Sequence, residues 1–144
     1  MIAVDTNVLV YARRAESPHH SRAKALVASL AEGNAPWALP WTVVYEFVRV
    51  VTHPRVFDPP SALDAVIRDL ESLLGSPSLT MLGEGPGHGR HMAEQLREGA
   101  ASGNLAHDAH IAALVVEHGV SELLTADRDF SRFPGVRARN PFAA

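Results

Sequence analysis

The chain has 144 residues, a formal net charge of −3, no cysteine and 47 % hydrophobic residues. This composition supports a single folded domain, residues 1–144, and it excludes a largely disordered chain, disulfide bonds, thiolate metal sites and a broad cationic surface for duplex DNA. No apolar run is long enough to cross a bilayer and no basic signal-peptide segment opens the chain, so we expect a cytoplasmic protein without a membrane partner.

Short apolar runs alternate with stretches of helical periodicity along the sequence. In chain order, the pattern predicts strand 1–4, helix 8–14, helix 17–32, strand 37–39, helix 42–52, helix 61–74, strand 79–82, helix 88–98, helix 105–118, strand 123–125 and strand 136–138. Strands that alternate with helices favour a parallel sheet covered by helices on both faces. The glycine-rich segment 83–89 is predicted to be a flexible loop.

Four carboxylates stand at positions that a purely structural chain would rarely use. Asp5 ends the first predicted strand and Asp127 lies two residues beyond the fourth, so both fall at the carboxyl edge of the sheet. Proteins of this class build their sites at that edge. Glu46 and Asp108 each interrupt the apolar face of a predicted helix. These positions predict one acidic site assembled from four separate elements.

Carboxylates that lie close together repel one another, and burying them is costly unless their charge is compensated. A divalent metal ion solves both problems, and oxygen ligands without thiolates favour Mg²⁺ or Mn²⁺. Such ions support hydrolysis of a phosphodiester by metal-activated water. The hypothesis assigns metal-binding and catalytic roles to Asp5, Glu46, Asp108 and Asp127, with Thr6, Asn7 and Thr125 orienting these ligands or contacting phosphate.

Each acid also has a purely structural explanation. Asp5 and Asp127 can cap the helices that follow them, and Asp108 can favour the first turn of its helix through the helix dipole. Glu46 can pair with an arginine at the edge of the core. All four acids converging on one edge by chance is much rarer than any one of these cases, so the pattern favours a shared site.

Four blocks of the sequence together resemble the PIN domain and, more narrowly, the VapC toxins of type II toxin–antitoxin pairs. Asp-Thr-Asn alone is a weak signal, but four blocks in the family's order and spacing are specific. The blocks are Val4-Asp5-Thr6-Asn7-Val8-Leu9, the helix that carries Glu46, Asp108-Ala109-His110-Ile111-Ala112-Ala113, and Leu124-Thr125-Ala126-Asp127-Arg128-Asp129-Phe130.

The resemblance implies a three-layer α/β/α sandwich with a central parallel sheet and a Mg²⁺- or Mn²⁺-dependent endoribonuclease toxin that cuts tRNA or rRNA loops. It implies Asp5, Glu46 and Asp108 as the acidic core and favours Asp127 over Asp129 as the fourth acid. It also implies a homodimer and a cognate VapB-type antitoxin whose tail blocks the acidic groove. The segment 83–89 is the part that the family pattern does not explain.

Candidate RNA contacts are fewer than the candidate metal ligands. Arg13, Arg14 and Arg128 lie close in sequence to the acidic edge, and arginine suits bidentate contact with phosphate. Every basic residue except Lys24 is an arginine, although a GC-rich coding bias explains that count better than function does. These three arginines are the predicted contacts with the RNA backbone.

Aromatic and histidine residues offer weaker signals. Trp37, Trp41 and Phe130 could stack on a base, but packing in the core is the more usual role of such residues. His107 and His110 are three residues apart on one predicted helix, a spacing that can bring two metal ligands together. The chain has no His-Glu-x-x-His motif, so the pattern does not favour a zinc enzyme.

Two other functions remain open from the residues alone. A haloacid-dehalogenase-like phosphatase uses an aspartate after its first strand as nucleophile, but its second acid would fall where Asn7 stands, and Lys24 is the only lysine. A response-regulator receiver would also need a well-placed lysine, which this chain does not offer. A non-catalytic interaction module would keep the acids as structural groups. Cleavage of RNA with Mn²⁺, lost in Asp5→Asn, separates the nuclease from the module.

Overall fold

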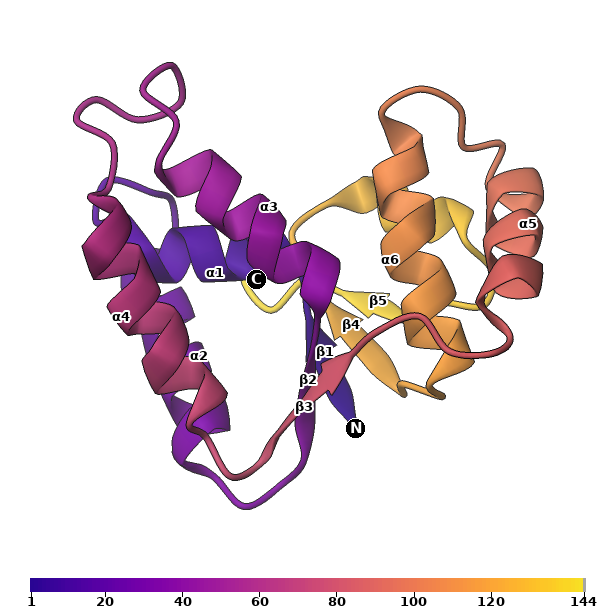
Figure 1. Ribbon diagram of the computed structural model, residues 1–144, viewed down its shortest axis with the longest axis horizontal. Coiled ribbons are helices and arrows are strands. Elements are labelled where there is room, and N and C mark those ends of the chain that lie inside the picture. Colours follow the sequence, from indigo (N-terminus) through magenta and orange to yellow (C-terminus); the bar gives the residue numbers. More distant parts are fainter. Residues whose placement is uncertain (144) are drawn as a thin grey trace.

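Five short strands form a parallel sheet at the centre of the computed structural model, which describes residues 1–143 (Figure 1). The strands are β1 (Ile2–Val4), β2 (Trp37–Pro40), β3 (Leu79–Leu82), β4 (Glu122–Leu124) and β5 (Ala138–Arg139). Their order across the sheet is β3-β2-β1-β4-β5, and every neighbouring pair is parallel. The chain therefore starts in the middle of the sheet, extends it on one side of β1 and then returns to extend it on the other. Such a switch point is where parallel sheets open a crevice at their carboxyl ends.

Helices flank this sheet on both sides. Helices α1 to α4 gather on one side of the central strands and α5 and α6 on the other (Figure 1). The sequence prediction of a PIN-like α/β sandwich with a central parallel sheet is confirmed. The helices are α1 (Thr6–Arg13), α2 (His20–Glu32), α3 (Trp41–Val51), α4 (Leu63–Leu74), α5 (His88–Glu98) and α6 (Leu105–Glu117), with a 3₁₀ turn η1 (Arg128–Arg132) near the end.

The inner strands are buried, because helices cover both faces of the sheet. Residues of β1, β2 and β4 such as Val4, Leu39 and Leu124 are at most 1 % exposed. Each such side chain contributes roughly 1.5–3 kcal/mol by leaving water. Trp37 and Phe130 are fully buried, which fits the interpretation of both as core residues. The core thus holds the carboxyl ends of β1 and β4 rigidly in place.

Two element boundaries in the first third of the chain differ from the sequence prediction. The first helix begins at Thr6, two residues early, because the side chain of Asp5 accepts a hydrogen bond from the Thr6 amide directly after β1. The second begins at His20 rather than Ser17, after His19 adopts a left-handed conformation with φ of 58°. The early start of α1 brings its first turn onto the sheet edge.

Other boundaries shift by one or two residues. The third helix starts at Trp41, directly after Pro40, rather than at Thr42, and the fourth helix starts at Leu63 rather than Ser61. The fourth strand is Glu122–Leu124 instead of 123–125, and β5 is Ala138–Arg139 instead of 136–138. The turn η1 was not predicted. Within residues 1–143, no helix combines the length and apolar character that crossing a membrane requires.

Candidate active site

The carboxyl ends of β1 and β4 open into a pocket of about 210 Å³. Asp5 follows β1 and Asp127 follows β4, while α3 contributes Glu46 and α6 contributes Asp108. The structure therefore brings together all four acids that the sequence analysis selected. The remaining wall is formed by Thr6, Asn7, Val10, Tyr11 and Val50.

Asp5 is the most enclosed of these acids, with only 5 % of its surface exposed. Its Oδ1 accepts a hydrogen bond of 2.7 Å from the backbone N–H of Thr6. Its Oδ2 accepts one of 2.7 Å from the Thr125 hydroxyl and one of 3.3 Å from the Asn7 amide. Asp5 thus does cap α1, as the structural explanation expected, but its second oxygen is held by side chains from two different elements.

Thr125 and Asn7 also tie the ends of β1 and β4 to each other. The Asn7 amide donates to the Thr125 hydroxyl over 3.2 Å, and the Ala126 N–H donates to the Asn7 side-chain oxygen over 3.1 Å. The same Thr125 hydroxyl accepts the Asp127 N–H over 3.0 Å. Because one hydroxyl binds both the Asp5 carboxylate and the backbone N–H of Asp127, it helps to position two acids at once.

Glu46 and Thr6 connect α3 to this network. The Thr6 hydroxyl lies 3.3 Å from Glu46 Oε2 and donates a hydrogen bond to it. Thr6 is itself buried, so this hydroxyl has a fixed position at the start of α1. All three predicted orienting residues therefore touch a predicted acid.

Asp108 lies beside two acids rather than one. Its carboxylate, that of Asp127 and that of Asp129 each offer one oxygen within 4.8 Å of the other two. Asp127 also accepts the Asp129 N–H over 2.8 Å and so caps η1. Asp129 is exposed and does not line the pocket, whereas Asp127 does. The residues alone did not show which of Asp127 and Asp129 belongs to the site, because the sequence pattern did not reveal the tight turn that places them side by side.

The pocket is strongly acidic, and two of its carboxyl groups, those of Asp5 and Asp108, have raised pKa values. Burial raises the pKa of Asp5 to about 7, and the charges of Glu46 and Asp108 add to that effect, although hydrogen bonds from Thr125 and Thr6 oppose it. Burial also raises the pKa of Asp108 to about 6, followed by repulsion from Asp127, Asp129 and Glu46. In the described part of the chain, no lysine, arginine or histidine forms an ion pair with any of these acids. Among the described residues these acids therefore have no ion-pair partner, and only the charge of His107 opposes the rise in the pKa of Asp108.

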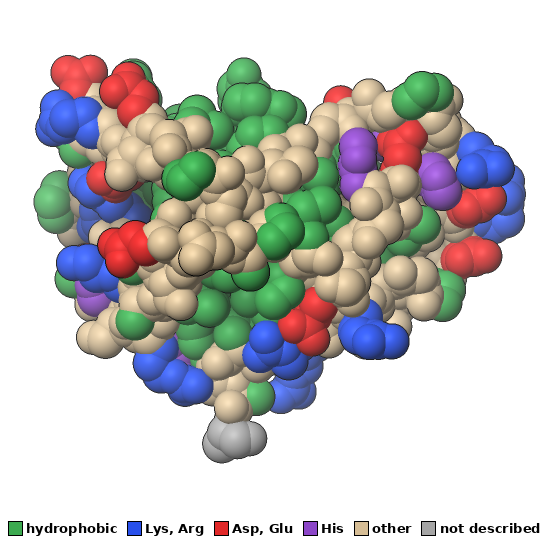
Figure 2. Space-filling view, turned by 90° about the horizontal axis from the view of Figure 1, so that it is seen from below, with side chains coloured by type: hydrophobic (Ala, Val, Ile, Leu, Met, Phe, Trp, Pro, Cys, Tyr) green, Lys and Arg blue, Asp and Glu red, His purple; other side chains and the backbone are tan. Residues whose placement is uncertain are grey.

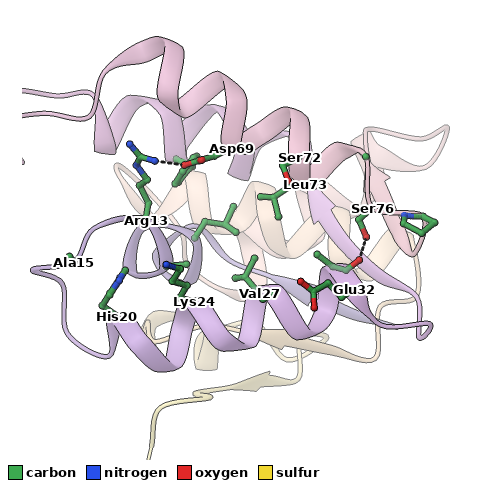
Figure 3. Close-up of a pocket in the computed structure, with 17 residues that line it drawn as sticks. Arg13, Ala15, His20, Lys24, Val27, Glu32, Asp69, Ser72, Leu73 and Ser76 are labelled. Carbon is green, nitrogen blue, oxygen red and sulfur yellow. Dashed lines mark hydrogen bonds and ion pairs between the residues drawn. The ribbon is translucent and has the colours of Figure 1, made fainter.

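The predicted arginine contacts do not all face this pocket. Arg13 forms an ion pair of 2.6 Å with Asp69 and lines a different groove of about 680 Å³ between α1, α2 and α4 (Figure 3). Arg14 pairs with Glu16 and lies over the ring of Phe57 at 4.5 Å. Both guanidinium groups thus hold neighbouring segments together.

Arg128 differs from these two arginines. It is exposed and directly follows Asp127 at the start of η1. Contact of any of the three with RNA stays a prediction, and the geometry favours Arg128.

Comparison with known proteins places this architecture in a family. The PIN domain model matches residues 2–136. Ribonuclease VapC48 from Mycobacterium tuberculosis is 36 % identical over 142 residues, an alignment that spans 96 % of each protein. The chain belongs to the VapC ribonuclease toxin family of PIN domains. The resemblance seen in the sequence and the ribonuclease class that it implied are both confirmed.

Solved structures of VapC proteins share the fold. The crystal structure of Mycobacterium tuberculosis VapC20, described as a toxin that cleaves the sarcin–ricin loop, superposes on this VapC chain with a TM-score of 0.68 at 21 % identity, covering 95 % of this chain and 99 % of the other. VapBC2 from Rickettsia felis, solved on a DNA fragment of its promoter, gives 0.64 at 21 % identity over 97 % and 98 %. At this identity the likeness concerns the fold alone.

Proposed function

We propose that this VapC chain is a divalent-metal-dependent endoribonuclease and the toxin of a VapBC-type pair. Its substrate would be a looped RNA, such as a tRNA or rRNA loop, hydrolysed at a phosphodiester. The observation that carries the proposal is the pocket where Asp5, Glu46, Asp108 and Asp127 meet without a compensating cation from the described chain.

The donor set of this pocket fits a hard divalent cation. All candidate ligands are carboxylate oxygens, with threonine and asparagine oxygens nearby, and no thiolate exists in the chain. Oxygen ligands suit Mg²⁺ or Mn²⁺. Asp5, Glu46, Asp108 and Asp127 would hold the ion, and Asp129 stands next to two of them. When bound, such an ion provides a nucleophilic water near neutral pH and stabilises charge on the phosphate and the leaving oxygen.

The residues of the chain have three tasks in this proposal. Thr125, Thr6 and Asn7 orient the carboxylate of Asp5, so that its free lone pairs point into the pocket without reorganisation. The raised pKa of Asp5, about 7, means that this group is partly protonated near neutrality until a cation displaces the proton, and Asp108, with a pKa of about 6, behaves in the same way at slightly lower pH. Arg128 stands outside the acidic centre, where it can contact a backbone phosphate.

The shape and charge of the site favour a flexible RNA. A pocket of about 210 Å³ holds one phosphate and its neighbouring atoms more readily than a stacked duplex. A chain with a net charge of −3 has no broad field for a rigid double helix. A single-stranded loop can bend its backbone into the pocket.

The groove between α1, α2 and α4 is the proposed docking place of the antitoxin. Its volume is about 680 Å³, with Val27, Phe47 and Leu73 among its apolar lining, and Arg13 and Asp69 on its wall (Figure 3). An amphipathic antitoxin segment could place apolar side chains in this groove. Because α1 also borders the acidic pocket, the tail of that segment could continue to the acids and block them.

A homodimer is also proposed, through a face of α3. Trp41 and Tyr45 lie one turn apart on this helix and are 42 % and 74 % exposed. Large aromatic side chains on one exposed helix face are typical of an interface.

The test is cleavage of a structured RNA by the purified chain, free of antitoxin, with Mn²⁺. The parent should produce endonucleolytic fragments, and Asp5→Asn should reduce the rate by about 10²-fold or more because it removes one charged metal ligand. Asp64→Asn, an exposed acid in the first turn of α4 that lies outside the pocket, is the matched control and should retain the parent rate. Equal inertness of parent and Asp5→Asn across several RNAs would contradict the proposal. Release of inorganic phosphate from small esters would instead indicate a phosphatase.

A further inference from the structure

The glycine-rich segment between β3 and α5 is held tightly by α6, in contrast to the flexible loop that the sequence predicted. The Glu117 carboxylate accepts hydrogen bonds from the backbone N–H groups of Gly85 and Gly87 at 3.0 and 2.9 Å. The His118 ring donates to the Gly83 carbonyl oxygen over 2.7 Å. Gly85 is needed for this close approach, because a Cβ there would lie 2.6 Å from a Glu117 oxygen.

This fixed segment places Glu84 against two histidines from different helices. His88 is the first residue of α5, and His110 lies in the middle of α6. Each of the three side chains offers one ligand atom within 4.8 Å of the other two. His110 Nε2 donates to Glu84 Oε1 over 2.7 Å, and the rings of His88 and His110 meet edge to face with centroids 5.4 Å apart. Figure 2 shows histidine and acidic side chains close together on the half of the molecule that contains α5 and α6.

One nitrogen in this group has no partner within the protein. Nδ1 of His88 is buried and forms no hydrogen bond with any residue of the described chain. A buried polar atom without a partner is costly, so this imidazole is under-satisfied by the fold alone.

Two imidazoles and one carboxylate form a donor set that differs from that of the acidic pocket. Nitrogen ligands favour Zn²⁺ and other late transition metals over Mg²⁺. Two histidines, one glutamate and an open fourth position are a known arrangement for tetrahedral zinc. Ligand atoms around such an ion lie about 3.4 Å apart, given metal–nitrogen bonds of about 2.0–2.1 Å. On binding, the 2.7 Å hydrogen bond between His110 Nε2 and Glu84 Oε1 would open and its proton would leave to solvent, and the 53 % exposed side chain of Glu84 is free to make this movement.

The acidic pocket and this cluster use opposite sides of one helix. Asp108 and His110 are two residues apart on α6, which separates their side chains by about 200° around the helix axis. Asp108 lines the acidic pocket, whereas His110 contacts Glu84 of the β3–α5 segment. His107, which the sequence analysis paired with His110, is exposed and is not part of the cluster. The second histidine comes from α5 instead, 22 residues earlier than His110.

We propose that Glu84, His88 and His110 bind one Zn²⁺ ion, which fastens the β3–α5 segment and the start of α5 to α6. The ion would add to the contacts that Glu117 and His118 make with Gly83, Gly85 and Gly87 of the same segment. Its fourth position would be left to water, and the ion is separate from the Mg²⁺ or Mn²⁺ expected at the acidic pocket.

The test is Zn²⁺ titration of the full chain without an affinity tag, in excess Mg²⁺ that occupies the acidic pocket. Calorimetry should show one equivalent bound, and Co²⁺ used as a spectroscopic substitute should give the intense visible bands of a four-coordinate ion that Zn²⁺ then displaces. His88→Ala, His110→Ala and Glu84→Gln should each weaken binding by more than about ten-fold, the loss that even outer-shell substitutions cause at metal sites. Glu84→Gln changes an exposed loop residue and keeps the test informative if a histidine variant folds poorly.

Two matched controls locate the ion. His107→Ala removes an exposed histidine one turn before His110 and should leave binding unchanged. Asp108→Asn disables the acidic pocket and should also leave Zn²⁺ binding unchanged. The proposal is overturned if no equivalent of Zn²⁺ binds in excess Mg²⁺, if His107→Ala weakens binding as much as His88→Ala, or if Asp108→Asn abolishes it. None of these outcomes depends on RNA cleavage.

Discussion

The two polar clusters that share α6 differ in how their charge is compensated. The acidic pocket gathers carboxylates that have hydrogen-bond donors but no ion-pair partner in the described chain. The second cluster, Glu84, His88 and His110, contains a carboxylate with an imidazole donor 2.7 Å away. The first group is therefore destabilising until a cation enters, whereas in the second the carboxylate is paired and, among the described residues, the buried Nδ1 of His88 still has no partner. One helix thus contributes to an acidic pocket with unpaired carboxylates on one side and to a paired Glu84–His110 contact on the other.

The strongest test of this difference is the pH dependence of stability without added metal. The pKa of Asp5 is about 7 and that of Asp108 about 6, both above the ordinary value of 3.8 that they regain on unfolding. As the pH rises from about 4 to 7, the unfolded chain loses protons that the folded chain retains, so the free energy of unfolding decreases. We expect a loss on the order of 2–4 kcal/mol, measured by urea denaturation, that levels off above pH 7.

Millimolar Mg²⁺ or Mn²⁺ should remove much of this loss, because the ion binds the charged carboxylates of the folded state only. The matched control is Asp64→Asn, which should reproduce the parent profile, whereas Asp5→Asn should flatten it. A profile that is flat in the parent would show that the pKa values of Asp5 and Asp108 are not raised in the folded state, and the proposed difference between the two clusters would be wrong.

Thr125→Val should decrease the free energy of unfolding by an intermediate amount. The hydroxyl of Thr125 donates to Asp5 and accepts from Asn7 and Asp127, so its loss leaves buried donors unpaired. We expect the free energy of unfolding to decrease by about 1–3 kcal/mol, and RNA cleavage to fall with it. Thr80→Val, at an exposed position of β3, is the matched control and should change stability by less than about 0.5 kcal/mol. If the two variants were equally stable and active, the orienting role of Thr125 would be excluded.

The smallest effect is expected at the loop that carries Glu84. A side chain in Gly85→Ala would meet Glu117 at 2.6 Å and displace its carboxylate from the loop N–H groups. We expect a decrease of about 1 kcal/mol in the free energy of unfolding, because hydrogen bonds to a charged acceptor are weakened. Gly89→Ala, where an added Cβ has no neighbour within 4 Å, should be neutral or slightly stabilising. Thermal unfolding of both variants measures this, and an unchanged Gly85→Ala would show that Glu117 does not restrain the loop.

Local sequence patterns were sufficient to predict the class of fold and most of its elements. The strand at 79–82 was placed at its observed bounds, because a short apolar run between turn residues has few alternatives. Boundaries failed where one side-chain contact decides them, as at Asp5 and His19. The turn η1 escaped prediction because it depends on the cap that Asp127 provides to Asp129.

The four acids of the pocket were selected from the sequence because each breaks an apolar pattern or ends a strand, and parallel strands place their carboxyl ends on one edge. The sequence by itself therefore determined which elements form and which acids converge. Only the tertiary structure decided how Asp129 joins Asp108, why Arg13 and Arg14 face other segments, and that His110 pairs with His88 instead of His107. Those contacts join residues whose separation along the chain has no regular period, so their proximity depends on how the helices pack.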